Sequence, residues 1–364
     1  MDAFTTQQTA ELVSRIGTKK AQMRLDKLWW NSFMSGPLLG FGCAVLLSTE
    51  AAPWYQENAP GLIRTIGALF FPIGLVMIVL SGSDLFTSNI MFMTTAFLQR
   101  RITFLDLLTN WVVSYLGNLA GMLFFMAVIT GYGGVFDMYA YRQETINFAT
   151  QKCVLPQWHQ IFLRAIGANW LVCFAVFISI SSREVVSKIV AIWWPTATFV
   201  ALGLDHVIAN MYFIPIAIWN AHPQITVSFY IWKSLIPTTL GNIVGGGLFV
   251  GVAYWYLFLT GSGSVDIDFN LGSLNTALEA GGPLGRARTR SQAMPNGQHE
   301  SEGEVLEGKA IDDDAAHVAR NGSTSLPHSG SYMASGIGKE LSTDIYANSA
   351  GQRQAIDEEK NTGR

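Results

Sequence analysis

The stretch GSDLFTSN, residues 82–89, interrupts an apolar segment, and the stretch GLDHVIAN, residues 203–210, does the same later in the chain. Both read G-x-D-x-x-x-x-N, and Phe92 and Phe213 correspond in the residues that follow. Burying acids, amides and hydroxyls in apolar surroundings costs free energy. A motif that is both costly and duplicated indicates a specific role. We call the two stretches octet 1 and octet 2.

Composition indicates a membrane protein. Of 364 residues, 50% are hydrophobic and only 13% are charged, with 11 Trp. This is more apolar and less charged than a typical soluble protein. We therefore expect neither an enzyme nor a nucleic-acid-binding protein. The three cysteines, Cys43, Cys153 and Cys173, have no C-x-x-C spacing, so we expect no disulfide framework, metal site or cofactor.

Charge divides the chain into regions. Residues 1–260 carry 14 Lys/Arg and 11 Asp/Glu, whereas residues 261–364 carry 9 and 15. The second region is rich in Gly, Ser, Asn and acids, and it has too few bulky apolar residues to offset the entropy of ordering. We predict a cytoplasmic amphipathic N-terminal segment at 1–27, a transmembrane domain at 28–260 and a disordered hydrophilic cytoplasmic tail at 261–364.

Six apolar segments reach the length of about 20 residues that a span requires. They are 28–48, 62–98, 105–131, 159–181, 189–219 and 232–260. At about 1.5 Å per residue, the second and the fifth would overshoot a hydrocarbon core of about 30 Å. Each of these two contains an octet. The octets are therefore predicted to break helices 2 and 5.

Basic residues predict the orientation in the membrane. The N-terminal segment and the two loops on its side hold nine Lys/Arg, and the opposite side holds five. Those five are Arg64, Arg142, Lys152, Arg164 and Lys233. Because cytoplasmic loops carry the excess of Lys and Arg, both termini are predicted to be cytoplasmic. We expect a multi-pass protein of the plasma membrane.

The duplication extends beyond the octets. LGNLAG at 116–121 corresponds to LGNIVG at 240–245, an offset of 124 residues against 121 for the octets. Three spans per half would insert the second half upside down, as an inverted 3+3 repeat whose broken helices meet near the midplane. Irregular backbone at that depth must be buried or line a cavity, so the octets are predicted to line a pore. Helix packing by Gly and small polar residues is the alternative.

Individual octet residues suggest roles. Asp84 and Asp205, with Asn89 and Asn210, are expected to support the helix breaks, the acids by accepting backbone N–H bonds as N-caps do. The alternative is that the two acids carry protons. Of the six histidines, His206 alone falls in the interior of a predicted span, since His159 stands at the first position of 159–181. An ionisable residue inside a span is a functional candidate. The alternative is a neutral histidine that a carbonyl satisfies. Positive partial charge at a half-helix N-terminus favours an anion.

Four motifs resemble those of the formate/nitrite transporter family. They are VLSGSDLFTS (79–88), AIGANWLVC (165–173), GLDHVIANMYFIP (203–215) and LIPTTLGNIVGG (235–246). The resemblance covers about residues 10–260. Asp84 stands where many bacterial members carry Glu, and the long tail lies outside the family core. The GSDLFTSN form is most similar to the fungal nitrite-uptake branch.

The resemblance implies an aquaporin-like protomer of six helices, a pore in each subunit and a homopentamer in the lipid bilayer. It assigns the substrate pore to His206 as central hydrogen-bond donor, with Thr87, Asn169 and Asn242 nearby and Lys152 as the basic residue of the outer vestibule. The apolar constrictions that it implies are formed by Phe71, Leu75, Leu85, Phe86, Val172 and Phe199.

This arrangement predicts transport of a small monovalent weak-acid anion. An apolar ring excludes hydrated ions, whereas a neutral acid crosses at low cost, so uptake is expected to be coupled to protons. Nitrite is the first choice of substrate, and formate or lactate is the alternative. Two readings from other classes stay open. One is a neutral-solute channel, although neither octet contains Asn-Pro-Ala, and the other is a nutrient sensor that signals through the tail.

Overall fold

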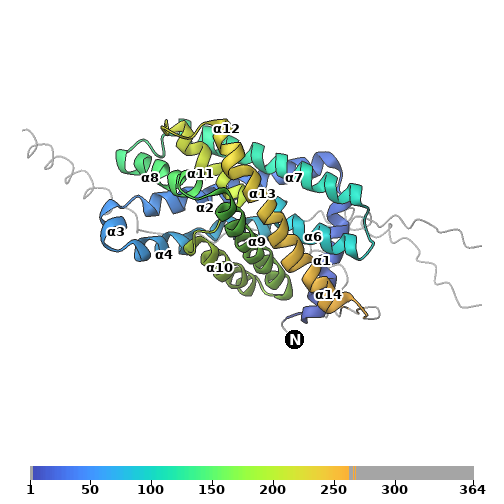
Figure 1. The fold of residues 1–364 in the computed structure, drawn as a ribbon. Coiled ribbons are helices and arrows are strands. Elements are labelled where there is room, and N and C mark those ends of the chain that lie inside the picture. The colour runs from blue at the N-terminus through green and yellow to red at the C-terminus, as the bar shows by residue number, and fades with distance from the viewer. Residues whose placement is uncertain (1–2, 262–264, 266, 268–364) are drawn as a thin grey trace, which may run out of the picture. The chain divides into compact units, whose positions relative to one another are not determined.

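The computed structural model describes residues 3–261, 265 and 267. All of them fall within Met1–Thr289, the first of two units into which the chain divides. The predicted disordered tail at 261–364 lies almost wholly outside the described residues and stays a prediction. The described residues are helical throughout their ordered elements, in agreement with the predicted all-α class (Figure 1).

The N-terminal half begins with a helix that a capping box opens at Thr5 and Gln8. Its helices are α1 (Thr6–Ala21), α2 (Leu25–Glu50), α3 (Pro53–Asn58), α4 (Pro60–Phe70), α5 (Ile73–Ser81), α6 (Phe86–Leu98) and α7 (Phe104–Phe124). A π-helical segment, η1 (Phe125–Tyr132), continues α7.

The second half repeats the alternation of long and short helices. Its elements are α8 (Tyr139–Ala149), η2 (Thr150–Val154), α9 (Trp158–Ser181), α10 (Val185–Ala201), α11 (Val207–Trp219), α12 (Val227–Tyr230), η3 (Ile231–Leu235), α13 (Ile236–Ile243), η4 (Val244–Val252) and α14 (Ala253–Leu259).

Five helical runs of the described chain are long and apolar enough to cross a membrane. They are Leu25–Glu50, Pro60–Ser81, Phe104–Tyr132, Trp158–Ser181 and Val227–Leu259. Three shorter apolar helices accompany them: α6, α10 and α11. The two segments that were too long for one span are thus each divided, 62–98 into Pro60–Ser81 and α6, and 189–219 into α10 and α11.

Both divisions have the same backbone geometry. After α5, Gly82 adopts a φ of +73°, and after α10, Gly203 adopts a φ of +67°. Such left-handed φ values favour glycine. The residues that precede α6 and α11 are also alike, since Leu85 has φ −101° and ψ 121° and His206 has φ −110° and ψ 124°. Each octet therefore ends one helix and starts the next in the same way.

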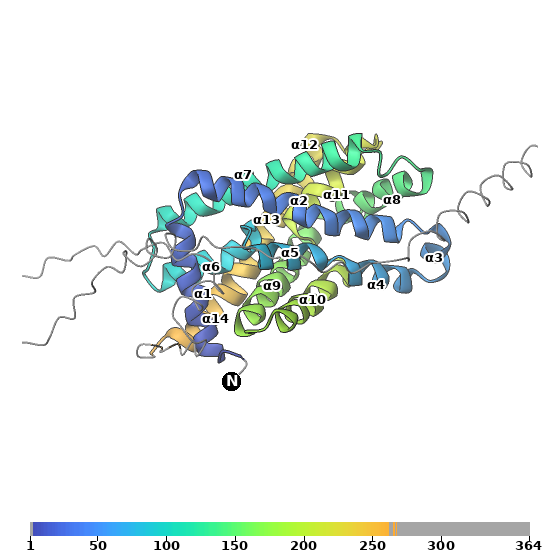
Figure 2. The same ribbon diagram turned by 180° about the vertical axis from the view of Figure 1, so that it is seen from behind.

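Small residues bring two matching helix pairs into close contact. Helix α7 packs along α2, and α13 packs along α9 (Figures 1 and 2). A Cβ at Gly121 would overlap the Phe33 carbonyl, and a Cβ at Gly245 would overlap the Ile166 carbonyl. These glycines end the two LGN-containing repeats. The duplication in sequence thus corresponds to a duplicated mode of helix packing.

The predicted N-terminal segment contains α1, which packs against α6. Gly17 lies so close to Phe92 that a Cβ would overlap its carbonyl. Val13 and Ala10 are buried in the main core cluster of the described chain. Helix α1 is thus part of the packed protein and is held in place at its interior face.

We predict that Gly121→Ala lowers stability. The added Cβ meets backbone that cannot move freely, and overpacking typically costs about 1–3 kcal/mol. The check is the temperature at which the detergent-solubilised protein loses its folded size-exclusion peak. Gly61→Ala is the matched control, because Gly61 has open space around it, and it should behave like the parent. Equal melting of Gly121→Ala and Gly61→Ala would contradict the close packing.

Candidate functional site

Two asparagines satisfy the backbone groups that the helix breaks leave free. The Oδ1 of Asn118 accepts the N–H of Phe86 at 2.8 Å, and its Nδ2 donates to the carbonyls of Asp84 and Ser32, each at 2.8 Å. Both asparagines lie in the LGN repeats, at matching positions. Asn118 did not emerge as a site residue from the sequence, although the repeat pairs it with Asn242.

Asn242 makes the corresponding bonds at octet 2. Its Oδ1 accepts the N–H of Val207 at 2.8 Å, and its Nδ2 donates to the carbonyls of Ala165 and Asp205 at 2.8 and 3.0 Å. The side-chain amide of Asn242 was expected to lie at the pore. Its hydrogen bonds all go to backbone groups, so Asn242 supports the backbone at octet 2.

Asp84 is bound by side chains and does not cap α6. Its carboxylate forms an ion pair with Lys20 of α1 and accepts hydrogen bonds from Asn31 Nδ2 at 2.6 Å and Asn89 Nδ2 at 3.2 Å. The N–H of Phe86, which opens α6, goes to Asn118 instead. The expectation that Asp84 acts as an N-cap was wrong. The side-chain amide of Asn118, from α7, accepts the N–H that opens α6, and Lys20 neutralises the buried charge of Asp84.

Asp205 has the equivalent partners at octet 2. Lys152 Nζ lies 3.3 Å from its Oδ1, and Asn210 Nδ2 donates to the same oxygen at 3.3 Å. Lys152 also donates to the carbonyls of Gly203 and Leu204 at 2.8 and 2.7 Å. All three N–H groups of the Lys152 ammonium are thus engaged by residues of octet 2. Although Lys152 borders the vestibule as expected, its charge is engaged by the break.

His206 joins the two octets. Its Nδ1 accepts the N–H of Ala209 at 3.2 Å, so the neutral ring carries its proton on Nε2. That Nε2–H faces the hydroxyl of Thr87 at 2.8 Å. Both residues are buried. Asn169 lies beside them, and its Nδ2 donates to the carbonyls of Thr87 at 3.1 Å and Asn242 at 2.7 Å.

A very small apolar space lies next to His206. Its volume is about 10 Å³, which is room for roughly one water. It is lined by Leu39, Phe71, Leu75, Leu85, Val172, Thr196, Phe199 and His206. Five of the six expected constriction residues are therefore brought together. Leu39 and Thr196 had no distinguishing signal in the sequence.

Phe86 is the expected constriction residue that does not line this space. Its ring packs edge-on against Tyr115 and Trp111, with centroid distances of 5.0 and 6.4 Å. Leu85 takes the inward position next to it. Successive residues at a helix start point in different directions, so the octet cannot direct both side chains inward.

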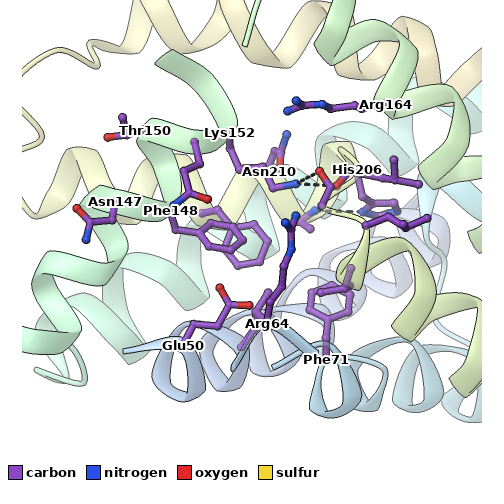
Figure 3. A pocket seen from close by; sticks show the side chains of 18 of the residues that line it. Glu50, Arg64, Phe71, Asn147, Phe148, Thr150, Lys152, Arg164, His206 and Asn210 are labelled. Atoms are coloured by element: carbon purple, nitrogen blue, oxygen red, sulfur yellow. Dashed lines mark hydrogen bonds between the residues drawn. The ribbon is translucent and has the colours of Figure 1, made fainter. Parts of the chain in front are cut away.

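A much larger cavity opens on the other side of His206. Its volume is about 810 Å³, and we call it the vestibule. Phe71, Phe199 and His206 border both spaces, and the Phe71 and Phe199 rings meet edge-to-face at 5.6 Å. We call these three residues the neck. Figure 3 shows four charged side chains around the vestibule: Glu50, Arg64, Lys152 and Arg164. Glu144 also lines it.

The site offers one hydrogen-bond donor, the His206 N–H, beside the apolar neck. Its described residues include no group of side chains that could bind a metal ion. Within residues 3–261, no group of three or more His, Cys, Asp or Glu could hold a metal ion. The polar side chains that line the small space are those of His206 and Thr196. A solute that passes from the vestibule to the small space must lose its water beside one N–H donor.

Comparisons with known proteins show which proteins this chain is similar to. Residues 7–256 match the profile of a family described as formate/nitrite transporter. The chain is 37% identical over 268 residues to a probable formate transporter of Methanothermobacter thermautotrophicus, covering 69% of this chain and 96% of that protein. It is 35% identical over 257 residues to an uncharacterised transporter of Saccharomyces cerevisiae, covering 70% of this chain and 41% of that protein. A solved pentameric formate channel with formate bound is similar with a TM-score of 0.57 at 26% identity, covering 65% of this chain and 98% of that one.

We predict that Lys20→Met strongly destabilises the protein. The change leaves the fully buried Asp84 without its counter-charge, and breaking a buried pair costs roughly 3–5 kcal/mol. Adding Asp84→Asn to Lys20→Met should recover much of the loss, because no charge then remains buried. The measurement is a double-mutant cycle on thermal unfolding of the purified protein.

The control for this cycle is the exposed pair Arg24–Asp26, whose side chains are 74% and 56% exposed. Such a pair contributes about 0–1 kcal/mol, so Arg24→Met should barely change stability. If Lys20→Met were as mild as Arg24→Met, the ion pair would not support octet 1.

Proposed function

This chain belongs to the formate/nitrite transporter family, and we propose that it moves a small monovalent weak-acid anion through a pore whose narrowest part is the neck beside His206. Its relatives are membrane transporters and channels and not enzymes. The observation that carries the proposal is the His206 Nε2 to Thr87 Oγ1 contact of 2.8 Å within an apolar ring.

The chemistry of that contact suits an anion. A bare anion is strongly disfavoured in apolar surroundings, and the neck offers it one N–H donor at the point where water is lost. Among the described residues, the hydrogen-bond partner of the His206 Nε2 is the Thr87 hydroxyl, and no carbonyl or carboxylate oxygen that could serve a cation is bonded to it. An oxygen of the passing anion can replace the Thr87 hydroxyl as acceptor. Thr87 thus keeps the donor directed toward the pore while no solute is bound.

Nitrite and formate are proposed to share this pore. Both are monovalent anions with two oxygens on one central atom. Neither the charge of the anion nor the geometry of the His206 donor distinguishes one from the other. The form of octet 1 supports nitrite, through its likeness to fungal nitrite-uptake proteins. Two of the similar proteins are a probable formate transporter and a pentameric formate channel, which supports formate no less. We expect each anion to compete with the other, and lactate to be the bulkier alternative.

Proton coupling follows from the same neck. A neutral acid crosses an apolar ring more easily than its anion does, so uptake of the anion with a proton is favoured. We propose that His206 contributes a hydrogen bond and does not itself cycle a proton. Protonation of the ring would require Nδ1 to give up its bond to the Ala209 N–H, which opens α11. The proton is then supplied through water of the vestibule.

The architecture that we propose is the inverted 3+3 repeat. Pro60–Ser81 with α6 would form the second span, and α10 with α11 the fifth. The paired breaks, the paired asparagines and the paired lysine–aspartate contacts support it. We further propose a homopentamer, which the pentameric formate channel supports, in the plasma membrane with both termini cytoplasmic, as the distribution of Lys and Arg favours.

We predict that His206→Phe nearly stops anion uptake. The change removes the donor where desolvation is worst, and losing a charge-assisted bond costs roughly 1.5–3 kcal/mol. This corresponds to a rate lower by about one to two orders of magnitude. Uptake of labelled nitrite and of labelled formate, each with the other as competitor, should be recorded with internal pH in proteoliposomes. His206→Asn keeps a donor without titrating, and we expect it to retain proton-coupled uptake.

His159→Phe is the matched control, because His159 is exposed at the start of α9. It should transport like the parent. Parent-like uptake by His206→Phe would make the histidine structural and overturn the site. Water or glycerol flux without any anion uptake by the parent would favour a neutral-solute channel.

A further inference from the structure

Two arginines of the vestibule make no hydrogen bond or ion pair in the described part of the chain, although Glu50 lies close enough to Arg64 to interact with its charge. Arg64 lies on α4 and Arg164 on α9, and both line the 810 Å³ cavity. Within residues 3–261 no hydrogen bond or ion pair engages either guanidinium group. Lys152, by contrast, is held by two carbonyls and Asp205. The available positive charge of the vestibule therefore belongs to the arginines.

Arg64 is placed directly over octet 2. A Cβ at Gly203 would overlap the guanidinium of Arg64, so glycine at this position makes room for it. Gly203 lies three residues before His206, and both line the vestibule. The matching glycine of octet 1, Gly82, has nothing within 4 Å of its Cβ position. Only the break that faces the vestibule thus carries a guanidinium group.

The second arginine approaches from another helix. In the view of Figure 3, Arg64 extends into the cavity from below, Arg164 lies above, and His206 lies to the right of Arg64 and below Arg164. Burial lowers the pKa of Lys152, Asp205 opposes the shift, and Arg64 and Arg164 lower it further. Both guanidinium groups are therefore close enough to act on the region above octet 2.

The acids of the vestibule only partly offset this charge. Glu50 and Glu144 line the same cavity. Burial, together with the neighbouring Glu50, raises the pKa of Glu144 to about 7, although a hydrogen bond from Gln56 opposes the shift. Near neutral pH, Glu144 is thus partly uncharged. Arginine side chains in general, unlike carboxylic acids, are protonated throughout the physiological pH range.

We propose that Arg64 and Arg164 form an anion-capture site in the vestibule, which holds a carboxylate-like anion before it loses its water at the neck. The proposal rests on the proposed function and adds a second binding position to it. A guanidinium group presents parallel N–H donors that match two oxygens on one atom, which formate and nitrite both have. Because both arginines remain in contact with water, binding is weak enough for the anion to move on.

The test is formate binding to the full-length chain in lipid nanodiscs. Line broadening of ¹³C-formate, titrated in chloride-free buffer, reports the dissociation constant without any transport step. For Arg64→Gln combined with Arg164→Gln, we expect the dissociation constant to rise at least fivefold, and each single change to give part of that rise. Arg64→Lys combined with Arg164→Lys keeps the charge but not the paired donors, and it should bind between the two.

The matched control is Arg142→Gln. Arg142 is exposed on α8 and does not line the vestibule, so the variant loses the same charge elsewhere. It should bind formate within twofold of the parent. Size-exclusion chromatography of each variant shows that it assembles like the parent before binding is compared.

The outcomes separate this site from the transport proposal. If the double Gln variant binds formate as tightly as Arg142→Gln, or if the parent binds none, the capture site is overturned. If binding depends on the two arginines while the parent takes up neither formate nor nitrite in proteoliposomes, the capture site stands and the transport function fails. In a transporting parent, the double variant should raise the half-saturating anion concentration more than it lowers the maximal rate.

Discussion

Backbone N–H and C=O groups that an interrupted helix sets free must find partners inside the protein, because hydrocarbon offers none. Asn118 and Asn242 meet this requirement with the same three bonds each. Each amide joins the start of a half-helix to the carbonyl before it and to a third helix. The position of Thr87 and of His206 depends on these bonds, since both follow directly from where the half-helices begin.

The charge at each break brings in a segment from elsewhere. Asp84 is paired with Lys20 of α1, and Asp205 is paired with Lys152 of η2. A buried carboxylate without such a partner is very costly, so each break requires its lysine segment to be in place. Folding of the N-terminal helix is thereby coupled to the geometry of octet 1, and the segment before α9 is coupled to octet 2.

The sequence predicted most of what local pattern and duplication can reveal. Each octet lies between two helices of the described chain, α5 and α6 or α10 and α11, and His206, Phe71 and Phe199 meet at the neck. Prediction from the sequence failed where contacts between residues far apart in the chain determine the partner of a side chain. Asp84 was expected to cap a helix, but the cap comes from a residue 34 positions away in the chain, Asn118. Periodicity alone did not show that Phe86 turns away from the pore.

The vestibule was also difficult to predict, since charge counting treats all basic residues on one side alike. Lys152 was singled out by family resemblance, yet three acceptors engage its ammonium. Whether a cation is free depends on which backbone carbonyls lie near it, and this is a property of the folded chain. Arg64 is revealed only by its position over Gly203.

The small space beside His206 has a consequence for the proton gradient across the membrane. Protons move rapidly along files of hydrogen-bonded water, and a volume of about 10 Å³ holds no such file. The neck formed by Phe71, Phe199 and His206 thus leaves no room for a continuous file of water between the vestibule and the small space. Under the proton-coupled uptake proposed above, a cell could keep many copies of such a pore in its membrane without dissipating its pH gradient, because a proton would cross only together with an anion.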